Sequence, residues 1–251
     1  MHTISLIIPC YNEELNIQKG VLDKIGNYVH HVPAIKEVII SDDGSTDNTK
    51  KLIKKEYLTQ YPLFKLLENE HKGKAQTLIS AILSAKSDYV LFTDIDLATP
   101  IEEVEKMAQE IERNTDIIIG SRSGTRRRGA PLTRKIMAVG FIFIRNFIIG
   151  LKNIKDTQCG FKAFRLEAAK KIIHSLVVFK NTQGVTGSSV SAGFDLEFLF
   201  LATKMKYSIT EIPVVWKHVE TKNVNFITDT LETLQDILRI KYYDIIGTYK
   251  I

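Results

Sequence analysis

The sequence is poor in cysteine and has no hydrophobic run of membrane-spanning length. Its two cysteines, Cys10 and Cys159, lie far apart and belong to no CxxC pair or cysteine–histidine cluster. This argues against a structural zinc and a disulfide framework, and it favours a reducing compartment. The longest apolar stretch, 136–151, is interrupted by Arg145 and falls short of the roughly 18 uncharged residues that indicate a spanning helix.

Familiar nucleotide-binding motifs and targeting segments are also missing. The GxGxxG of dinucleotide-binding folds and the GxxxxGK[ST] phosphate loop do not occur, so an ordinary dinucleotide or ATP site is not expected. Met1 leads into a strand pattern without a basic region and an apolar signal segment. We therefore expect a cytoplasmic protein whose membrane contact is peripheral and on the cytoplasmic face.

The composition suits a globular protein with anionic partners. The 251 residues fit one large domain or two small ones. The formal net charge of +5 favours a nucleotide, a phosphate, a membrane surface or a nucleic acid, without choosing among them. The scattered histidines His71, His174 and His218 are predicted to be surface or core fillers.

Strand patterns alternate with helix patterns over the first 120 residues. Strands are predicted at 4–8, 38–41 and 64–67, from Tyr89 to Asp94, and at 117–120. This alternation is typical of parallel strands in a layered α/β sheet. Polar or acidic loops follow the first, second and fourth strands. Because ligands of such sheets lie beyond the carboxyl ends of the strands, a nucleotide is expected there.

The fourth strand ends in a DxD motif, Asp94-Ile95-Asp96. Side chains two residues apart lie on the same face of an extended chain, so both carboxylates can point at one spot. Hard oxygen ligands suit Mg²⁺ or Mn²⁺, which predicts a metal that holds a substrate diphosphate. The alternative is that the two aspartates only solvate the strand end and cap the next segment.

The second half begins with an arginine-rich loop, which is predicted to bind phosphate rather than to be a solvated run of charge. Its arginines are Arg122, Arg126, Arg127, Arg128 and Arg134. The apolar helix 136–151 follows, and beside such a loop it is predicted to face a membrane. A short strand near 162–164, helices up to about 176 and over 193–206, a strand at 209–216 and a helical tail at 226–246 complete the pattern.

Four signals in order resemble the family 2 glycosyltransferases. They are Pro9-Cys10-Tyr11-Asn12-Glu13-Glu14, Asp42-Asp43-Gly44-Ser45-Thr46-Asp47, the DxD and Gly120-Ser121-Arg122. The segments 156–162 and 194–197 look like the dolichyl-phosphate β-glucosyltransferase branch, whose close relatives are the dolichyl-phosphate mannose synthases. The resemblance implies a GT-A fold, a Rossmann-like, mostly parallel sheet flanked by helices. It also implies a domain over 1–225, with a nucleotide-sugar half (1–120) and an acceptor half (121–225), and a C-terminal amphipathic helix over 226–251.

The resemblance also implies a role for individual residues. The nucleotide sugar would be bound by Pro9, Tyr11, Glu13, Asp42, Asp43, Lys74, Asp94, Asp96 and Glu197. Within this set Asp42 would accept a hydrogen bond from the base, and Lys74 would approach the base or ribose. The metal would be held by Asp94 and Asp96. The acceptor phosphate would be bound by Arg122, Arg126, Arg127, Arg128, Arg134 and Lys162. The catalytic residues would be Asp96, Asp156, Asp195 and Arg122, with Asp156 and Asp195 orienting groups rather than abstracting a proton.

The implied activity is inverting, metal-dependent transfer of a hexose, with UDP-glucose as the favoured donor, onto a polyprenyl or dolichyl phosphate. Mannose synthases of the family often carry glutamine two residues after the DxD, whereas this chain has Ala98; this favours glucose. The open alternatives are a GDP-mannose-dependent synthase, transfer to a sugar or protein hydroxyl, a nucleotidyltransferase and a non-catalytic nucleotide-binding scaffold. Nucleic-acid binding is not expected, because no aromatic stacking platform accompanies the arginines.

Overall fold

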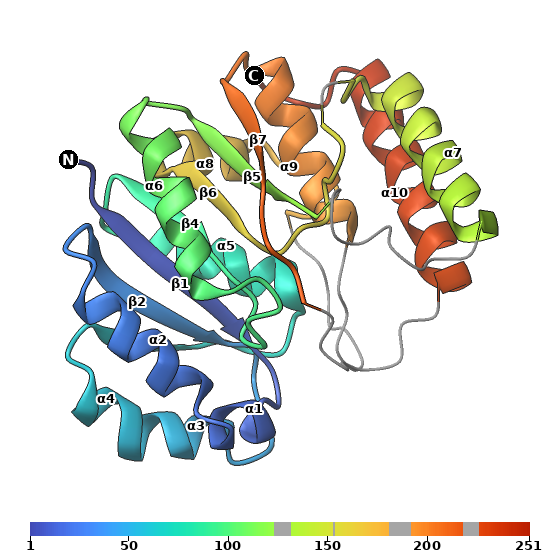
Figure 1. Ribbon diagram of the computed structural model, residues 1–251. Coiled ribbons are helices and arrows are strands. Elements are labelled where there is room, and N and C mark those ends of the chain that lie inside the picture. The colour runs from blue at the N-terminus through green and yellow to red at the C-terminus, as the bar shows by residue number, and fades with distance from the viewer. Residues whose placement is uncertain (123–131, 153, 181–191, 218–225) are drawn as a thin grey trace.

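The computed structural model describes residues 1–122, 132–152, 154–180, 192–217 and 226–251, with the backbone alone for 132–139, 192 and 226–230. Within these residues, seven strands form one sheet flanked by helices (Figure 1). Across the sheet the strands are β3 (Phe64–Glu68), β2 (Ile35–Asp42), β1 (Ile4–Cys10), β4 (Tyr89–Phe92), β6 (Lys162–Arg165), β5 (Ile117–Ser121) and β7 (Ile209–Pro213). The expected α/β class with a mostly parallel sheet is confirmed.

The helices follow the strands in the predicted alternation. The helical elements are α1 (Glu14–Gln18), α2 (Val21–His30), α3 (Thr49–Leu52), a π-helical turn (Ile53–Tyr57), α4 (Leu58–Gln60), α5 (Lys74–Ser84), a 3₁₀ turn (Ile101–Glu103), α6 (Val104–Glu112), α7 (Leu132–Ile149), α8 (Leu166–Ser175), α9 (Ala192–Lys204) and α10 (Phe226–Ile245). The single helix predicted up to Tyr57 is therefore divided by a π turn.

Strand β6 interrupts the parallel order. It pairs antiparallel with β4 on one side, where Phe92 lies opposite Lys162, and antiparallel with β5 on the other, where Ile119 lies opposite Lys162. The sequence predicted a short strand here but not its place in the sheet. Because β6 runs in the opposite direction, its first residues lie at the same edge of the sheet as the last residues of β4 and β5.

The core lies on both faces of the sheet. Along β1, Leu6 and Ile8 pack into one buried cluster and Ile7 into the other, as the alternation of side chains along a strand requires. All seven residues of β1 are buried, and so are all four of β4. Continuous burial on both faces explains the apolar runs of these strands, and it fixes the strand ends that carry the site.

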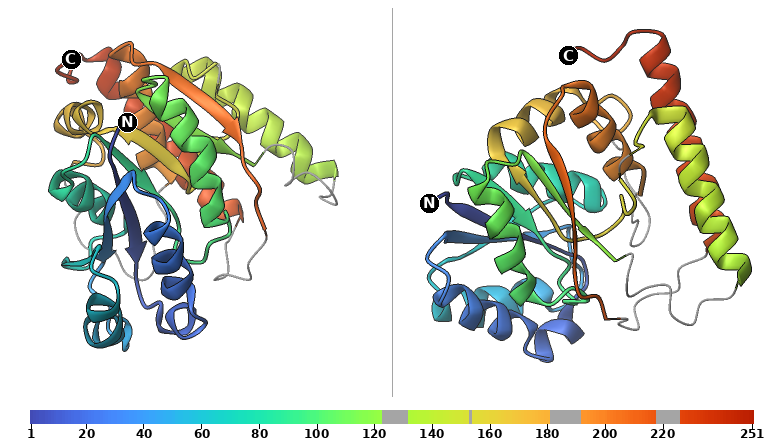
Figure 2. Two further views of the ribbon diagram at one scale, coloured as in Figure 1. Left: turned by 60° about the vertical axis from the view of Figure 1, so that its left-hand side comes forward. Right: turned by 45° about the horizontal axis from the view of Figure 1, so that its top comes forward.

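Helices α7 and α10 pack against each other beside the sheet, and α10 also packs on α9 (Figures 1 and 2). We call these two helices the α7–α10 pair. Its outer surface exposes large apolar side chains: Phe143, Ile144 and Phe147 on α7, and Leu231, Leu238, Tyr242 and Ile245 on α10. No helix among the described residues combines the length and apolar character needed to cross a bilayer.

Candidate functional site

The loops that follow β1 and β2 are tied together at the carboxyl edge of the sheet. Asn12 has a left-handed backbone, with φ at 54°, and its side-chain oxygen accepts hydrogen bonds from the backbone N–H groups of Thr46 and Asp47 at 2.8 and 3.3 Å. The Glu13 N–H donates to Thr49 Oγ1 at 2.8 Å. Pro9 lies within β1, in register with Ser41 of β2. The first two predicted motifs therefore form one connected surface.

Asp42 ends β2 and is fully buried. One of its carboxylate oxygens accepts a hydrogen bond from the Ser45 N–H at 3.0 Å, and the other lies 3.9 Å from the Cys10 sulfur. Burial, followed by the charge of Asp42, raises the pKa of the Cys10 thiol well above its ordinary value. Cys10 is therefore a neutral neighbour of Asp42 and not a nucleophile.

Asp43 holds the loop that leads into α5. Its carboxylate accepts hydrogen bonds from the Lys72 N–H at 2.9 Å and from the Gly73 N–H at 3.0 and 3.1 Å, and it lies 3.0 Å from Nδ1 of His71. The His71 ring stacks on Tyr11, with centroids 4.2 Å apart and planes 9° apart. His71, which the sequence predicts to be a surface or core filler, lies among the predicted nucleotide residues. The sequence signal for a role of His71 in the site was its position two residues before Gly73, the residue that leads into α5.

The DxD follows β4, and a lysine meets it. The Lys74 ammonium contacts Asp94 Oδ1 directly, so Lys74 lies at the DxD, whereas the resemblance implied the base or ribose region. Asp96 accepts a hydrogen bond from the Ala98 N–H at 2.9 Å. Burial, opposed by that hydrogen bond and assisted by the charge of Asp94, raises the pKa of Asp96. The site therefore favours a compensating positive charge beside Asp96.

Gly160 lies directly against the DxD. A Cβ built on Gly160 would collide with the Asp94 carboxylate, so only glycine leaves room for that side chain. Two residues later, Lys162 is almost fully buried, and its Nζ lies 2.8 Å from Oδ1 of Asp195 at the start of α9. The insertion of β6 between β4 and β5 thus brings Gly160 and Lys162 between the DxD and Arg122.

Arg122 and Asp156 form a buried, two-pronged ion pair. The guanidinium Nε and Nη2 each donate to an oxygen of Asp156 at 2.7 Å, and the Arg122 N–H adds a bond of 3.0 Å. Glu211 of β7 accepts the backbone N–H groups of Lys155 and Asp156 at 3.1 and 2.7 Å. Arg145 of α7 donates to the Ile154 carbonyl and to Thr157 Oγ1. Glu211 and Arg145 both hold the loop around Asp156, and no motif in the sequence predicts this role for either residue.

Glu197 has a structural position. It is fully buried in α9, and its carboxylate accepts the backbone N–H groups of Val177, Val178 and Phe179 at 2.8 to 2.9 Å and the Tyr249 hydroxyl at 2.9 Å. It therefore holds the segment after α8 and the C-terminal tail in place. Its predicted contact with the nucleotide sugar stays a prediction.

The remaining predicted phosphate ligands fall outside these contacts. Arg126, Arg127 and Arg128 lie outside the described residues, and Arg134 lies in α7, where the backbone alone is described. Of the predicted acceptor residues, Arg122 and Lys162 are therefore the two whose side chains the structure describes.

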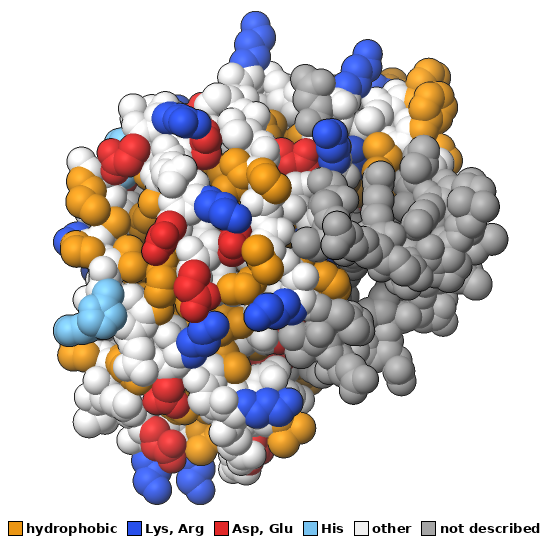
Figure 3. All heavy atoms as spheres, viewed as in Figure 1, with side chains coloured by type: hydrophobic (Ala, Val, Ile, Leu, Met, Phe, Trp, Pro, Cys, Tyr) orange, Lys and Arg blue, Asp and Glu red, His pale blue; other side chains and the backbone are white. Residues whose placement is uncertain are grey.

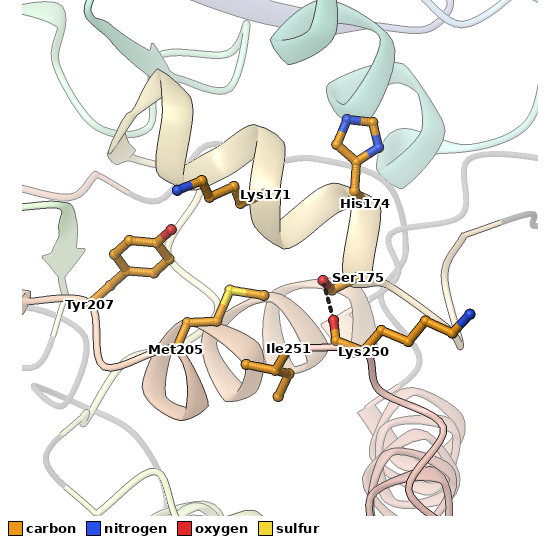
Figure 4. Close-up of a pocket in the computed structure, with 7 residues that line it drawn as sticks. All are labelled: Lys171, His174, Ser175, Met205, Tyr207, Lys250 and Ile251. Atoms are coloured by element: carbon orange, nitrogen blue, oxygen red, sulfur yellow. Dashed lines mark hydrogen bonds between the residues drawn. The ribbon is translucent and has the colours of Figure 1, made fainter.

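A separate pocket lies at the other end of α9 (Figure 4). Met205 and Tyr207 line it where α9 ends, whereas Asp195 lies at the helix start; 13 residues of α-helix span about 20 Å. Lys171, His174, Ser175, Lys250 and Ile251 complete the lining, and Ser175 Oγ donates to the Lys250 carbonyl at 2.9 Å. The pocket therefore contains none of the predicted site residues.

Comparisons with known proteins identify the family and show a similar fold. The family model described as "Glycosyl transferase family 2" matches residues 5–173. The chain is 31% identical to a dolichyl-phosphate beta-glucosyltransferase of Saccharomyces cerevisiae, covering 98% of this chain and 76% of that protein. It is 32% identical to one of Dictyostelium discoideum, covering 99% and 76%. A glucosyl-3-phosphoglycerate synthase of Mycobacterium tuberculosis, crystallised with Mn²⁺, UDP and glucosyl-3-phosphoglycerate, has a similar fold, with a TM-score of 0.66 at 18% identity over 96% of this chain and 80% of that one.

Proposed function

Because this chain belongs to glycosyl transferase family 2, we propose that it moves glucose from UDP-glucose onto a polyprenyl phosphate such as dolichyl phosphate. The observation that carries the proposal is the meeting of three strand ends. The DxD carboxylates after β4 lie beside the cations Lys162 and Arg122, which belong to β6 and follow β5. One site therefore offers carboxylates for a donor complex and cations for an acceptor phosphate. The named activity of the yeast and Dictyostelium relatives supports this assignment.

The donor side takes a base that carries a ring N–H. A carboxylate such as Asp42 accepts from uracil or guanine but not from adenine, which has no ring N–H. Tyr11, already stacked on His71, offers an aromatic face for the base. The UDP bound to the mycobacterial neighbour and Ala98 in place of glutamine both favour UDP-glucose over GDP-mannose. Calorimetric titration should therefore rank UDP above GDP and ADP, and tighter binding of ADP than of both would refute the donor.

The DxD suits a divalent cation that binds together with the donor. Among the described residues no three carboxylate, histidine or cysteine groups converge as a self-sufficient metal site. Mg²⁺-like ions are commonly held by one or two carboxylates and complete their shell with water and substrate phosphates. Asp94 and Asp96 fit that mode, and a bound cation would stabilise the charge of the departing diphosphate. Loss of activity in EDTA and its recovery with Mg²⁺ or Mn²⁺ would be the expected behaviour.

A phosphate acceptor fits the other half of the site. A phosphate monoester carries between one and two negative charges at pH 7 and needs no proton removed before it attacks. It does need cations that offset the repulsion of the donor diphosphate. Arg122 and Lys162 supply that charge, and Asp156 and Asp195 orient them at 2.7 and 2.8 Å. An acceptor oxygen then attacks the anomeric carbon while the bond from that carbon to the diphosphate oxygen of UDP-glucose breaks. UDP leaves with the bonding electrons, and the configuration inverts to a β-linked product.

The α7–α10 pair supplies a surface for the lipid end of the acceptor. Phe143 and Phe147, in the C-terminal half of α7, are 71% and 83% exposed. Hydrophobic side chains gather over this half of α7 in Figure 3. Burying one such side chain contributes about 1.5–3 kcal/mol, enough for reversible attachment when several act together. The double variant Phe143→Ser/Phe147→Ser should lose co-sedimentation with anionic vesicles. Leu15→Ser, which alters a residue of α1 that is 72% exposed, is the matched control.

The acceptor assignment is tested by transfer of labelled glucose in detergent. The protein is incubated with UDP-glucose, a divalent cation and either a polyprenyl phosphate or the same polyprenol without its phosphate. We expect product from the phosphate alone. Transfer to a free sugar or peptide, with none to polyprenyl phosphate, would overturn the proposal.

A further inference from the structure

The position of Lys74 is set by two carboxylates. Asp43 holds the backbone N–H groups of Lys72 and Gly73, which directly precede it, and Asp94 contacts its ammonium. The backbone before Lys74 and the ammonium at the end of its side chain are therefore each fixed by a carboxylate, and the ammonium lies directly against the DxD.

The ammonium occupies the oxygen of Asp94 that a cation needs. One oxygen, Oδ1, contacts Lys74, while Oδ2 lies where a Cβ on Gly160 would be and is covered on that side by the main chain. Asp96 has one oxygen engaged by the Ala98 N–H. The Asp94 side chain is nevertheless 41% exposed, so a ligand can reach the pair from solvent. A cation that binds Asp94 through Oδ1 must compete with Lys74.

We infer that Lys74 is an exchangeable counter-ion of the DxD, displaced from Asp94 when the cation and the donor diphosphate bind together. This inference rests on the proposed function, which supplies the cation and the diphosphate. Without a nucleotide, Lys74 neutralises one of the two carboxylate charges and weakens cation binding. With a nucleotide, the released ammonium turns to the diphosphate and offsets its charge. Lys74 thus couples the two binding events, and the coupling is reciprocal.

Removing the charge of Lys74 should change the two affinities in opposite directions. We would measure Mn²⁺ binding to the nucleotide-free protein by the electron paramagnetic resonance of free Mn²⁺, and UDP binding at saturating Mn²⁺ by calorimetry. Lys74→Met removes a unit charge that contacts the site directly. Compared with the unmodified protein, this variant should bind Mn²⁺ about tenfold more tightly and UDP about tenfold more weakly. A merely structural lysine would move both affinities in the same direction or neither.

Two further variants control the experiment. Lys72→Met removes the same charge from the same loop, where the ammonium pairs with Glu70 at 2.8 Å; screening by solvent should keep both affinities within about twofold of the unmodified protein. Lys74→Arg keeps the charge and should keep weak Mn²⁺ binding, and circular dichroism checks that each variant is folded.

The outcomes separate the inference from the proposed function. Unchanged or weaker Mn²⁺ binding by Lys74→Met, in a protein that otherwise binds Mn²⁺ and UDP, would overturn the role of Lys74 alone. Failure of the unmodified protein to bind Mn²⁺ even with UDP would overturn the metal in the proposed function, and the exchange with it. Failure of polyprenyl phosphate as acceptor would leave the exchange intact.

Discussion

The carboxylates on the two sides of the site are held in different ways. On the side of β1 and β2, Asp42 and Asp43 accept hydrogen bonds from backbone N–H groups. On the side of β4, β6 and β5, Asp94, Asp195 and Asp156 each contact the side chain of a lysine or arginine, and Asp156 in addition accepts the Arg122 N–H. Backbone donors stay where the fold puts them, whereas a cation can leave its carboxylate for an anionic ligand. We therefore expect the first side to offer a fixed surface for the nucleoside, and the second side to hold ion pairs that ligands can rearrange.

The largest effect on kcat is expected at the DxD, where the cation should bind. Asp96→Asn removes one of the two carboxylates that would hold the cation, and kcat should fall at least about 100-fold, because metal stabilisation of leaving-group charge is worth several kcal/mol. Asp116→Asn is the control, because that aspartate precedes β5 at the opposite edge of the sheet from the DxD and pairs with Arg165 at 2.8 Å. It should lose stability and keep kcat. Equal kcat for both variants would contradict the role of Asp96 in holding the cation.

The second effect comes from the close approach of Gly160 to Asp94. Gly160→Ala places a methyl group where the Asp94 carboxylate lies, so the DxD must shift, and kcat should fall about tenfold or more, as for other small displacements of catalytic groups. Gly140→Ala adds the same methyl group where nothing lies within 4 Å and should leave kcat unchanged. Steady-state kinetics with both substrates would give kcat for each variant. A kcat of Gly160→Ala that is unchanged, like that of its control, would refute the steric argument.

A smaller and more selective effect is expected at Arg122. Arg122→Lys keeps the charge but loses the two-pronged geometry that meets Asp156 at 2.7 Å, and lysine does not reproduce such a fork. The KM for polyprenyl phosphate should rise about tenfold, the value of one charge-assisted hydrogen bond, while the KM for the nucleotide sugar stays within about twofold. A rise in KM for the nucleotide sugar alone would show that Arg122 binds the donor and not the acceptor, and would contradict the assignment.

The smallest effect concerns stability and pH in α10. Burial, offset by Arg239 and reinforced by Glu232, raises the pKa of Asp236 from 3.8 to about 6. The native state therefore binds this proton more tightly than the unfolded state, and stability increases as pH falls through about 6. Asp236→Asn should be more stable than the unmodified protein by about 1–2 kcal/mol at pH 8, and urea unfolding should show the difference disappearing by about pH 4.

Asp244 in the same helix provides a control of opposite sign. Burial raises its pKa, but Lys204 and Lys241 outweigh burial and lower it on balance. Its ionised form is therefore stabilising above the ordinary pKa of an aspartate and loses that contribution as pH falls. Asp244→Asn should be less stable than the unmodified protein at pH 8. Parallel pH dependence for both variants would contradict the assignment of these two groups.

The sequence predicted the fold through its local patterns. Apolar runs separated by helix patterns predicted the strands up to Ser121, because burial on both faces of a central strand demands such runs. The antiparallel insertion of β6 was not predictable, because it depends on the pairing of Lys162 with two strands that come earlier in the chain. For the same reason the contacts of Lys74 and Gly160 with Asp94 needed coordinates. A glycine entering a strand was the one local hint of a close approach.

In the proposed mechanism Asp156 and Asp195 hold cations, and the acceptor phosphate brings its own nucleophilic charge. The most direct test is a comparison of kcat and of the KM for polyprenyl phosphate between the unmodified protein and Asp195→Asn at pH 7.5. A nucleophile that is already ionised needs no general base, so Asp195→Asn should raise the KM for polyprenyl phosphate and change kcat by less than about tenfold. A fall in kcat of about 100-fold or more at an unchanged KM is the effect of losing a general base; it would show that Asp195 abstracts a proton and would contradict this mechanism.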